Sequence, residues 1–338
     1  MNAGAFALGT FSLAGGSQFA GVAIGDQVLP VRALSRHMRA NEIPPGATDT
    51  LLGLLEYWPR AFVALEDAVR ESSAAETFAL SSLRVHAPIP RPGTIYCSGA
   101  NYRKHVVELI MAHQGSEETR KLSVDEKRAW AMRLMDRRAE EGTPFIFVKP
   151  QSSVTGPFDE ISVPDVSLKP DWELELAVII GRRARRVSRE RALEYVAGYT
   201  IANDITLRSK VFRRPTDSPE MGMDFVVSKG APGFLPLGPY LVPAAFVPDP
   251  QSLALTLKLN GEVMQDESTA DMIFTVARLI EYLSADVELQ PGDVICTGSP
   301  AGNGAHYGRF IQDGDELEGA ITGLGVQRNR CVLDRSTH

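Results

Sequence analysis

The sequence predicts an α+β fold, mainly β, in which a small N-terminal α/β domain precedes a larger domain. The length of 338 residues corresponds to about two domains, at roughly 150 residues per domain. Most regular patterns are short apolar or alternating segments bounded by Gly, Pro, Asn and Asp, which is typical of strands. A proline-rich joint at residues 86–93 separates them into two groups. We therefore expect domains at residues 1–85 and 91–335.

The bulk composition excludes several classes of protein. Apolar residues make up 44% and charged residues 23% of the chain, as in ordinary globular proteins. The net charge of −7 argues against nucleic-acid binding. No stretch approaches the roughly 20 apolar residues that span a bilayer, and the first residues lack the basic region of a secretory signal. Three scattered cysteines form no disulfide or structural zinc pattern. We expect a cytoplasmic protein with no membrane partner.

We expect the first 85 residues to form a small domain that supports the larger one. Strands are expected at residues 6–11, 19–24 and 28–31, with glycine-containing turns between them. Two helical patterns follow, one over residues 48–58 and one that begins at Pro59. No residue in this region suggests chemistry.

A candidate general base lies just beyond the proline-rich joint. An apolar strand at residues 94–97 is followed by a helix start near residue 101, in which His105 and Glu108 are three residues apart. In a helix this spacing places both side chains on one face. A carboxylate beside an imidazole raises the pKa of the imidazole and fixes its orientation, which makes a general base. Any helix can carry such a pair by chance, so the spacing alone leaves both interpretations open.

Residues 111–143 form a highly charged insert between two apolar strands. Its second half, residues 127–141, has a helical pattern. The insert is expected to be a lid over a site, a dimer contact or a solvated excursion, and the sequence does not separate these alternatives.

The most unusual segment is residues 171–181, where acids alternate with apolar residues before the run becomes fully apolar. In a strand, Asp171, Glu173 and Glu175 point to one face and the intervening apolar residues to the other. Three carboxylates on one face repel one another unless a cation binds or their pKa values rise. The alternative is an edge strand that uses its charge to resist aggregation.

A second expected strand, residues 197–206, carries Asp204 within an apolar run. A buried aspartate must be paired or bound to a cation, because an unpaired carboxylate in a low dielectric is costly. Between the two strands, the four arginines of residues 182–186 are an anion site or, more simply, a solvated turn. Ser188 is the expected N-cap of a helix that runs through Tyr195.

The last third of the chain supplies loops. Residues 229–239 are too rich in Gly and Pro for regular structure, and Asn260-Gly261 predicts a hairpin. A helix is expected over residues 273–283 and a strand over residues 294–297. The glycine-rich loop at 298–304 offers free backbone N–H groups and the Thr297 hydroxyl to an anion. It lacks the Lys-Ser/Thr ending of a phosphate-binding P-loop, so a carboxylate is the expected ligand.

With these residues in place, the chain resembles the fumarylacetoacetate hydrolase family over residues 91–330. The resemblance rests on ordered blocks that include Asn101-Tyr102 with His105-x-x-Glu108, Phe147-x-Lys149-Pro150, the acidic strand, Gly198 to Asp204, Leu237-Gly238-Pro239, Asn260-Gly261-Glu262, and Pro291-Gly292-Asp293 to Pro300. It implies the mixed β-sandwich or β-roll catalytic domain of the family, and homodimers.

The resemblance also implies roles for single residues. Glu173, Glu175 and Asp204 match the metal ligands of the family, and three oxygen ligands suit Mg²⁺ or alternatively Mn²⁺ or Ca²⁺. Asp171 matches no metal role and is expected to be structural or to support the ligands. The expected catalytic residues are His105, Glu108 and Lys229. The expected substrate-binding residues are Tyr102, Arg208, Thr297 and Gly298.

Three departures from the family pattern bear on the substrate. Pro232 stands where many members carry Asp, Val211 replaces a common Gln, and the insert is much longer than in compact members. They indicate a larger or less polar substrate than a small dicarboxylate.

The function expected from these residues is divalent-metal-dependent hydrolysis of a C–C bond in a 1,3-dicarbonyl, namely an acylpyruvate or a diketo acid from aromatic ring fission. The cation would polarise the enolate oxygens of this small 2-oxo acid, and His105 with Glu108 would activate water. The same site could instead serve a decarboxylase, an isomerase or a hydratase. A non-catalytic module with a structural Ca²⁺ is the alternative from another class.

Overall fold

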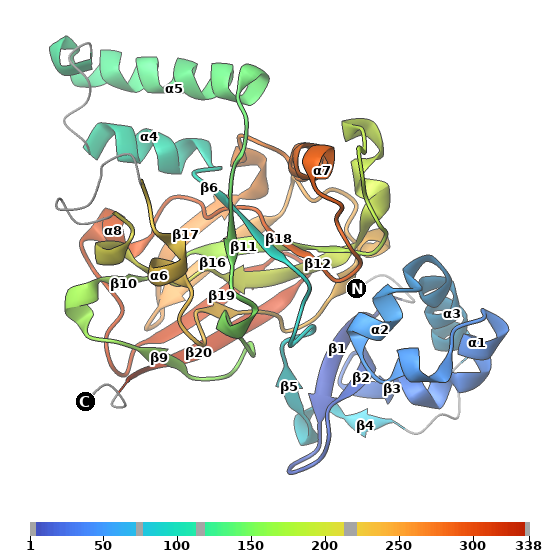
Figure 1. Cartoon of the computed structure of the whole chain (residues 1–338). Coiled ribbons are helices and arrows are strands. Elements are labelled where there is room, and N and C mark those ends of the chain that lie inside the picture. Colours follow the sequence, from blue (N-terminus) through green and yellow to red (C-terminus); the bar gives the residue numbers. More distant parts are fainter. Residues whose placement is uncertain (1–4, 72–76, 113–118, 213–221, 335–338) are drawn as a thin grey trace.

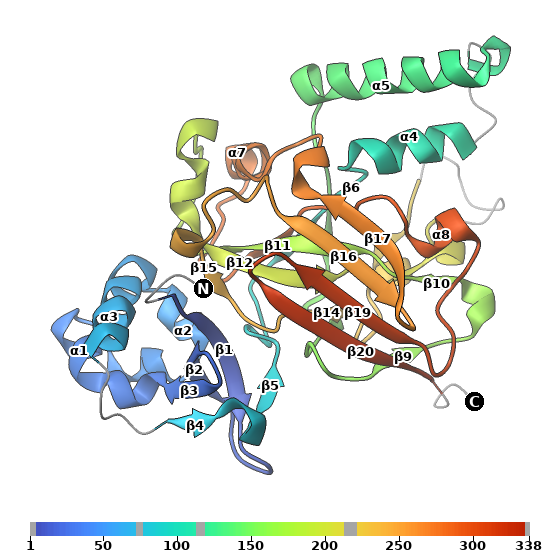
Figure 2. The same ribbon diagram turned by 180° about the vertical axis from the view of Figure 1, so that it is seen from behind.

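Two β-sheets packed against each other form the centre of the larger part of the chain (Figure 1, Figure 2). The structure is a computed structural model that describes residues 5–71, 77–112, 119–212 and 222–334. The six-stranded sheet has the order β15-β12-β11-β18-β6-β7, and the five-stranded sheet has the order β17-β16-β19-β20-β9. The fold is α+β and mainly β, as the sequence predicts.

The strands of these two sheets come from the whole second part of the chain. Their bounds are β6 Ile95–Gly99, β7 Phe145–Lys149, β9 Ile161–Val163, β11 Leu174–Ile180, β12 Val196–Asn203, β15 Val242–Pro243, β16 Ala254–Leu259, β17 Glu262–Ser268, β18 Val294–Cys296, β19 Glu316–Ile321 and β20 Gly325–Leu333. Two short pairs complete the β-structure: β10 Pro170–Asp171 with β13 Thr206–Leu207, and β8 Val154–Thr155 with β14 Leu235–Pro236.

The N-terminal part has its own sheet, with the order β4-β3-β2-β1-β5. Its strands are β1 Ala7–Ser12, β2 Phe19–Ile24, β3 Gln27–Pro30, β4 Phe78–Ala79 and β5 Arg84–His86, and its helices are α1 Ser35–Ala40, α2 Leu51–Leu55 and α3 Trp58–Glu71. The side chain of Thr50 caps α2, so this helix begins after residue 50, later than the expected pattern over residues 48–58. Leu8 exchanges two backbone hydrogen bonds of 2.8 Å with Leu241, so β1 joins this sheet to the larger part.

The side chains of strand β11 alternate between two hydrophobic cores. Leu174, Leu176 and Val178 lie in the core between the two large sheets, whereas Ala177 and Ile179 lie in a second core shared with the N-terminal helices. Because successive strand residues point to opposite faces, Glu175 lies on the same side as Ala177. The carboxylates therefore lie on the face away from the sandwich interior, where polar groups can gather without disturbing its packing.

Several local predictions differ from the structure. The acidic segment is not one strand: β10 ends at Asp171 and β11 begins at Leu174. It is not an edge strand either, because β11 pairs with both β12 and β18. Asp204 follows the last residue of β12 and so lies at a strand end, where a side chain can turn away from the ladder.

Two further predictions from the sequence need correction. Residues 189–195 form a 3₁₀-helix, and the Ser188 side chain makes no capping hydrogen bond. Lys229 is the last residue of a short helix, α6 Phe225–Lys229, rather than a loop residue. The hairpin expected at Asn260-Gly261 joins β16 to β17, and both residues have positive φ (52° and 86°), as this turn requires.

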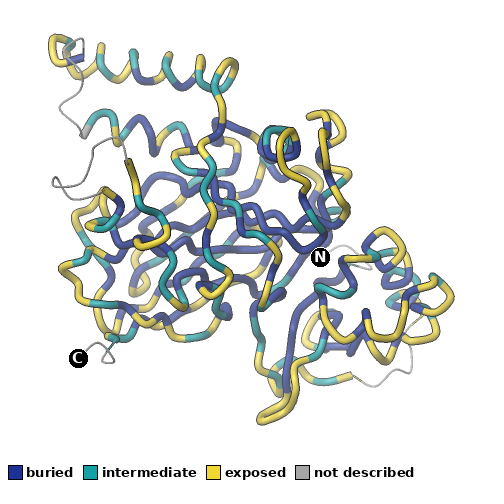
Figure 3. Tube along the Cα trace, viewed as in Figure 1, coloured by how far each residue is buried: buried dark blue, intermediate teal, exposed yellow. Residues whose placement is uncertain are grey.

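The remaining helices lie on the outside of the large sheets (Figure 1). They are α4 Arg103–Ala112, α5 Val124–Glu141, α7 Val276–Asp286 and the one-turn α8 Gly304–Tyr307. Helix α5 belongs to the charged insert, whereas α4 precedes it and ends at its start; residues 113–118 of the insert lie outside the described residues. Helix α5 is mostly exposed and buries only Ala131 and Met135, while the central strands are buried (Figure 3). Among the described helices, none combines the length and apolarity needed to cross a membrane.

Candidate metal and catalytic site

Three buried carboxylates meet where β11 begins and β12 ends. The two strands are antiparallel, with Leu174 opposite Asn203, so Glu173 and Glu175 flank the position that Asp204 follows. The backbone N–H of Asp204 donates to the carbonyl of Glu173 at 2.9 Å. One carboxylate oxygen from each of the three residues lies within 4.8 Å of the others. The fold therefore brings together the three acids that the sequence singled out.

Two buried lysines neutralise part of this cluster. Lys149, the last residue of β7, donates from Nζ to Asp204 Oδ1 at 2.5 Å. Lys229, at the end of α6, donates to Glu173 Oε2 at 2.5 Å and to Asp204 Oδ2 at 2.6 Å. Burial disfavours the charged lysine, but Asp204 and Glu173 outweigh it and raise the pKa of Lys229. Both lysines thus form ion pairs with the carboxylates.

Arg208 extends the network to the fourth acid, Asp171. Its guanidinium donates from Nε to Asp171 Oδ2 at 2.7 Å and from NH2 to Glu173 Oε1 at 2.6 Å. Although burial opposes ionisation of Glu173, Arg208 and Lys229 hold the pKa of this carboxyl below its usual range. Asp171 is itself fully buried and also accepts hydrogen bonds from the backbone N–H groups of Gly304 and Ala305, at 2.5 and 3.1 Å. It links the cluster to the glycine-rich loop.

Glu175 differs from the other three acids. Within the described part of the chain, no lysine or arginine lies within ion-pair distance of its carboxylate, which accepts one hydrogen bond, from the backbone N–H of Gly298 at 2.7 Å. Burial, and after it the neighbouring Cys296 thiol and Asp204 carboxylate, raise the pKa of Glu175 well above its usual value. A cation bound between Glu175, Glu173 and Asp204 would remove this penalty. Three carboxylate oxygens are also the donors that hard divalent ions prefer, so the residues present fit a divalent metal.

His105 lies on α4, and its side chain faces this cluster. It is buried, and burial is the main cause that lowers its pKa from 6.5 to about 4; Glu173 opposes the shift, while Arg208 and Lys229 add to it. His105 is therefore a neutral imidazole near neutral pH, which can accept a proton. The sequence argument expected the pKa to be raised, because it assumed that a carboxylate would lie beside the ring.

The expected pairing of His105 with Glu108 is not present in the structure. The Glu108 carboxylate instead contacts His306 on α8, with Oε2 at 3.2 Å from Nδ1 of the ring. His306 also lies close enough to His105 to lower the pKa of His105. No pattern in the sequence identifies His306, since it is nearly two hundred residues away from Glu108 in the chain.

The predicted substrate-binding residues divide into two groups. Thr297 donates its hydroxyl to the carbonyl of Leu176 at 2.8 Å, and the Gly298 N–H is taken by Glu175, so both groups are occupied. The expectation that this loop offers free N–H groups is thus wrong at Gly298. By contrast, the Tyr102 hydroxyl is buried and has no hydrogen-bond partner among the residues that the structure describes, and burial followed by Glu175 raises its pKa. Arg208 is engaged with Asp171 and Glu173 as described.

Glycine at position 298 is a structural requirement. Its φ is +96°, and a Cβ there would lie 2.8 Å from the Ser98 carbonyl oxygen. Only glycine combines this backbone conformation with so close an approach. The loop after β18 can therefore pass next to β6 and present its N–H to Glu175.

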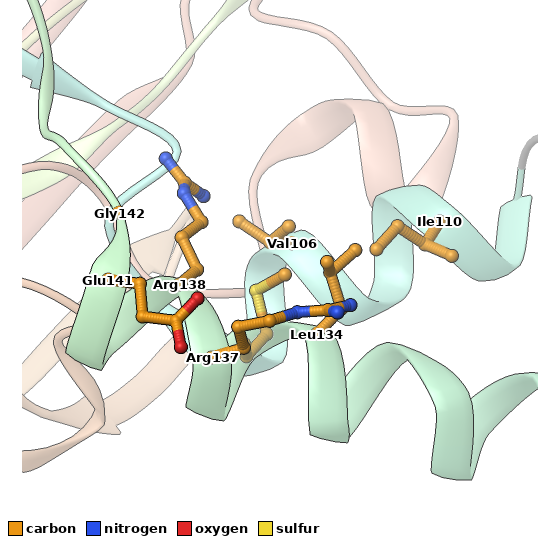
Figure 4. Close-up of a pocket in the computed structure, with 8 residues that line it drawn as sticks. Val106, Ile110, Leu134, Arg137, Arg138, Glu141 and Gly142 are labelled. Atoms are coloured by element: carbon orange, nitrogen blue, oxygen red, sulfur yellow. The ribbon is translucent and has the colours of Figure 1, made fainter.

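Helices α4 and α5 enclose a pocket of about 440 Å³ beside the site (Figure 4). Its lining is largely apolar: Val106, Ile110, Leu134, Met135, Arg137, Arg138, Glu141 and Gly142. Val106 follows His105 on α4, so the wall of the pocket and the candidate base belong to the same helix.

Comparison with known proteins identifies relatives over most of the chain. The family described as "Fumarylacetoacetate (FAA) hydrolase C-terminal" matches residues 94–332. The oxaloacetate tautomerase YisK of Bacillus subtilis is 35% identical over 257 residues, which cover 75% of this chain and 74% of the relative.

Two solved structures extend the comparison to three dimensions. Maleylpyruvate hydrolase from Sphingobium sp. SYK-6, in complex with manganese(II) and pyruvate, has a TM-score of 0.70 and 26% identity over 97% of this chain and 99% of the other. The 5-carboxymethyl-2-hydroxymuconate delta-isomerase from Mycobacterium smegmatis has a TM-score of 0.65 and 25% identity over 97% and 99%. Proteins similar to this chain thus carry names for three different reactions.

Proposed function

The chain belongs to the fumarylacetoacetate hydrolase family of metal-dependent enzymes, and from this premise we propose that it hydrolyses a C–C bond in a 1,3-dicarbonyl acid. The substrate class is an acylpyruvate or a diketo acid from ring fission. The observation that carries the proposal is the buried Glu175 carboxylate, which lies in the same cluster as Glu173 and Asp204. Unlike these two acids, it forms no ion pair with a lysine or arginine of the described residues. A neutral, buried His105 faces that cluster.

Glu173, Glu175 and Asp204 would hold the divalent cation, Mg²⁺ or Mn²⁺. When bound, it supplies Lewis-acid polarisation of the two substrate oxygens. The solved hydrolase similar to this chain contains manganese(II) and pyruvate, which supports both the ion class and the 2-oxo acid.

The side chains of this protein would carry out the proton transfers and stabilise the charges that develop during cleavage. His105 accepts a proton from water, and the resulting hydroxide oxygen bonds to the acyl carbonyl carbon. The C–C bond then breaks, its electron pair passes to the pyruvate fragment, and the proton on His105 returns to that fragment. Overall, an acylpyruvate and water give pyruvate and a carboxylic acid. Lys229 would stabilise an oxygen that gains negative charge through its positive charge, because its three N–H groups already donate to Glu173, Asp204 and Thr206. The Tyr102 hydroxyl can donate to a substrate carboxylate.

Keto–enol tautomerisation of a 2-oxo acid is the second candidate. It is favoured by the contact of Glu108 with His306, because hydrolysis by the expected dyad needs Glu108 beside His105. The name of the Bacillus subtilis relative points in the same direction. Tautomerisation only moves a proton between carbon and oxygen, so it needs no activated water.

One experiment separates these two reactions. The purified protein with Mg²⁺ or Mn²⁺ is incubated with maleylpyruvate, with a series of acylpyruvates and with the enol form of oxaloacetate, and the products are followed by NMR. Hydrolysis releases pyruvate and a second acid in equal amounts, whereas tautomerisation consumes the enol signal with no cleavage. His105→Gln should abolish turnover, and His37→Gln in the N-terminal helix α1 is the control. If no acylpyruvate is cleaved while the oxaloacetate enol is consumed, the hydrolase proposal is rejected.

A further inference from the structure

Glu108 and His306 form a contact between two helices next to the candidate site. Glu108 is on α4, the helix of His105, and His306 is on α8. Their side chains are 43% exposed for His306 and 36% exposed for Glu108, with 3.2 Å between Nδ1 and Oε2. A soluble acid that enters the site can therefore reach both groups, unlike the buried lysines deeper in the cluster.

His306 is held on a turn that is fixed directly to the carboxylate cluster. The first two N–H groups of α8 donate to Asp171, which in turn is bound by Arg208 together with Glu173. The next residue, Tyr307, packs edge-on against the His306 ring at 4.8 Å and donates its hydroxyl to the Met264 carbonyl at 2.9 Å. The imidazole of His306 thus has a fixed position relative to the cluster, so it can bind the Glu108 carboxylate in a defined place.

The beginning of α4 is fixed as well. The Asn101 side chain exchanges hydrogen bonds with the backbone of Phe274, and the Lys104 N–H donates to Asp271 at 2.9 Å. His105 follows directly, and Glu108 lies three residues further, on the same helical face. Rotation about the side-chain bonds of Glu108 alone can therefore carry its carboxylate from His306 to His105.

We propose that His306 is a positioning residue that holds Glu108 away from His105 until a second carboxylate of the substrate replaces Glu108 on the His306 ring. Glu108 is then free to orient His105. The exchange keeps one carboxylate on the His306 ring, since one leaves as another arrives, and it adds a contact between Glu108 and His105. It deepens the proposed function and rests on it in one respect, the role of His105 as base. The substrate class it selects is a 2-oxo acid with a second, distal carboxylate.

A binding experiment tests the exchange without turnover. The chain has six histidines, so the ring signals of ¹⁵N-histidine-labelled full-length protein with Mg²⁺ can be assigned from His306→Gln and His105→Gln. Pyruvate serves as the monocarboxylic probe and 2-oxoglutarate as the dicarboxylic probe. We expect 2-oxoglutarate to shift the signals of both His306 and His105, and pyruvate to leave the His306 signal in place.

The variant His306→Gln makes a second, independent prediction. In the unliganded variant the His105 signal should already lie near the position it takes in the wild type with 2-oxoglutarate, because Glu108 has lost its other partner. A matched control is His37→Gln, which removes a His–Glu contact of 2.9 Å between α1 and α3 and should leave the His105 signal unchanged. An unmoved His306 signal with 2-oxoglutarate, or an unmoved His105 signal in His306→Gln, would overturn the exchange.

Kinetics separate positioning from a merely structural role. His306→Gln should raise KM for a dicarboxylic substrate about tenfold, the value of one charge-assisted hydrogen bond, while KM for a monocarboxylic acylpyruvate stays unchanged. Equal losses of kcat on both substrates, with KM unchanged, would instead assign His306 to the stability of α8 and overturn the proposal. If the wild type cleaves none of these acids but the NMR response is as expected, the proposed hydrolysis fails while the exchange of Glu108 stands.

Discussion

Replacing Glu175 by Gln should leave the metal-free protein stable but remove most of its response to a divalent metal. Gln has the shape of a protonated glutamic acid, and its side-chain oxygen can still accept the Gly298 N–H. Because burial and neighbouring groups raise the pKa of Glu175, its charged form is disfavoured when no cation is present, and Gln removes that charge. We therefore expect the free energy of unfolding of the metal-free variant to lie within about 1 kcal/mol of wild type, as for a substitution that conserves volume and hydrogen bonding.

The structure sets the size of the metal effect. The carboxylate oxygens lie within 4.8 Å of one another, so two full charges at that distance would repel by about 3.5 kcal/mol at an effective dielectric constant of 20. The cation must overcome this repulsion, and Glu175 is the ligand that no lysine or arginine already neutralises. Loss of groups that only support metal ligands weakens binding by about 10–100-fold, so loss of a ligand should cost at least about a hundredfold.

This loss of affinity converts into a shift of the melting temperature. At a metal concentration of about 100 times the wild-type Kd, binding stabilises the folded state by about 2.7 kcal/mol, and a hundredfold weaker variant gains about 0.4 kcal/mol. For a chain of this size, about 2 °C per kcal/mol gives a metal-dependent rise in Tm that is about 5 °C smaller in the variant.

The assay is thermal unfolding in EDTA and in a Mg²⁺ or Mn²⁺ series, for wild type, Glu175→Gln and the exposed control Glu288→Gln. Because a proton must leave Glu175 when the cation binds, the apparent affinity of the wild type should also rise with pH. A variant that keeps the full metal-dependent rise in Tm would refute the assignment of Glu175 as a ligand.

Two further substitutions test the charges around the cluster. The pKa of His105 falls from 6.5 to about 4 on folding, so the unfolded chain binds the proton first as pH falls; stability is full above pH 6.5 and decreases by about 3 kcal/mol towards pH 4. His105→Gln should remove this part of the pH dependence in urea unfolding with EDTA, and an unchanged slope would contradict a buried neutral ring. Lys149→Met should lower the free energy of unfolding by about 3 kcal/mol, because Asp204 keeps only Lys229 as a cationic partner. The control Lys258→Met, at a partly exposed ion pair, should cost less than about 1 kcal/mol. Equal losses of stability in the two variants would show that the buried ion pair contributes no more than the partly exposed one.

The sequence predicted the parts of the site that depend on local periodicity. Alternation along residues 171–181 places Glu173 and Glu175 on one face whatever the strand packs against, and the structure has them there. The pair Asn260-Gly261 predicts its hairpin for a similarly local reason, the positive φ of both residues. The apolar run around Asp204 marked this residue as a buried acid, and the family blocks then joined it and Lys229 to the two glutamates, which no spacing rule could have done.

The parts that could not be predicted are contacts between distant segments. The partner of Glu108 is decided by where α8 lies, and α8 is held by Asp171 from the start of the acidic segment. Lys149 was visible only as part of the block Phe147-x-Lys149-Pro150, and its burial beside Asp204 depends on the position of β7 at the edge of the sheet. Helical spacing shows that two side chains can meet, but not that a third residue competes for one of them.

The charges of the cluster indicate why a metal and an acidic substrate belong together here. The network holds four carboxylates, Asp171, Glu173, Glu175 and Asp204, against three cations, Lys149, Arg208 and Lys229. Without a metal the network has one carboxylate more than it has cations, and burial with the neighbouring groups raises the pKa of Glu175, so an incoming anion is not attracted. A divalent ion turns the same network positive, and in a buried, low-dielectric environment a positive charge is best balanced by an anion. The three protein cations are thus too few to bind an acid by themselves, yet enough to make a metal-loaded site bind one.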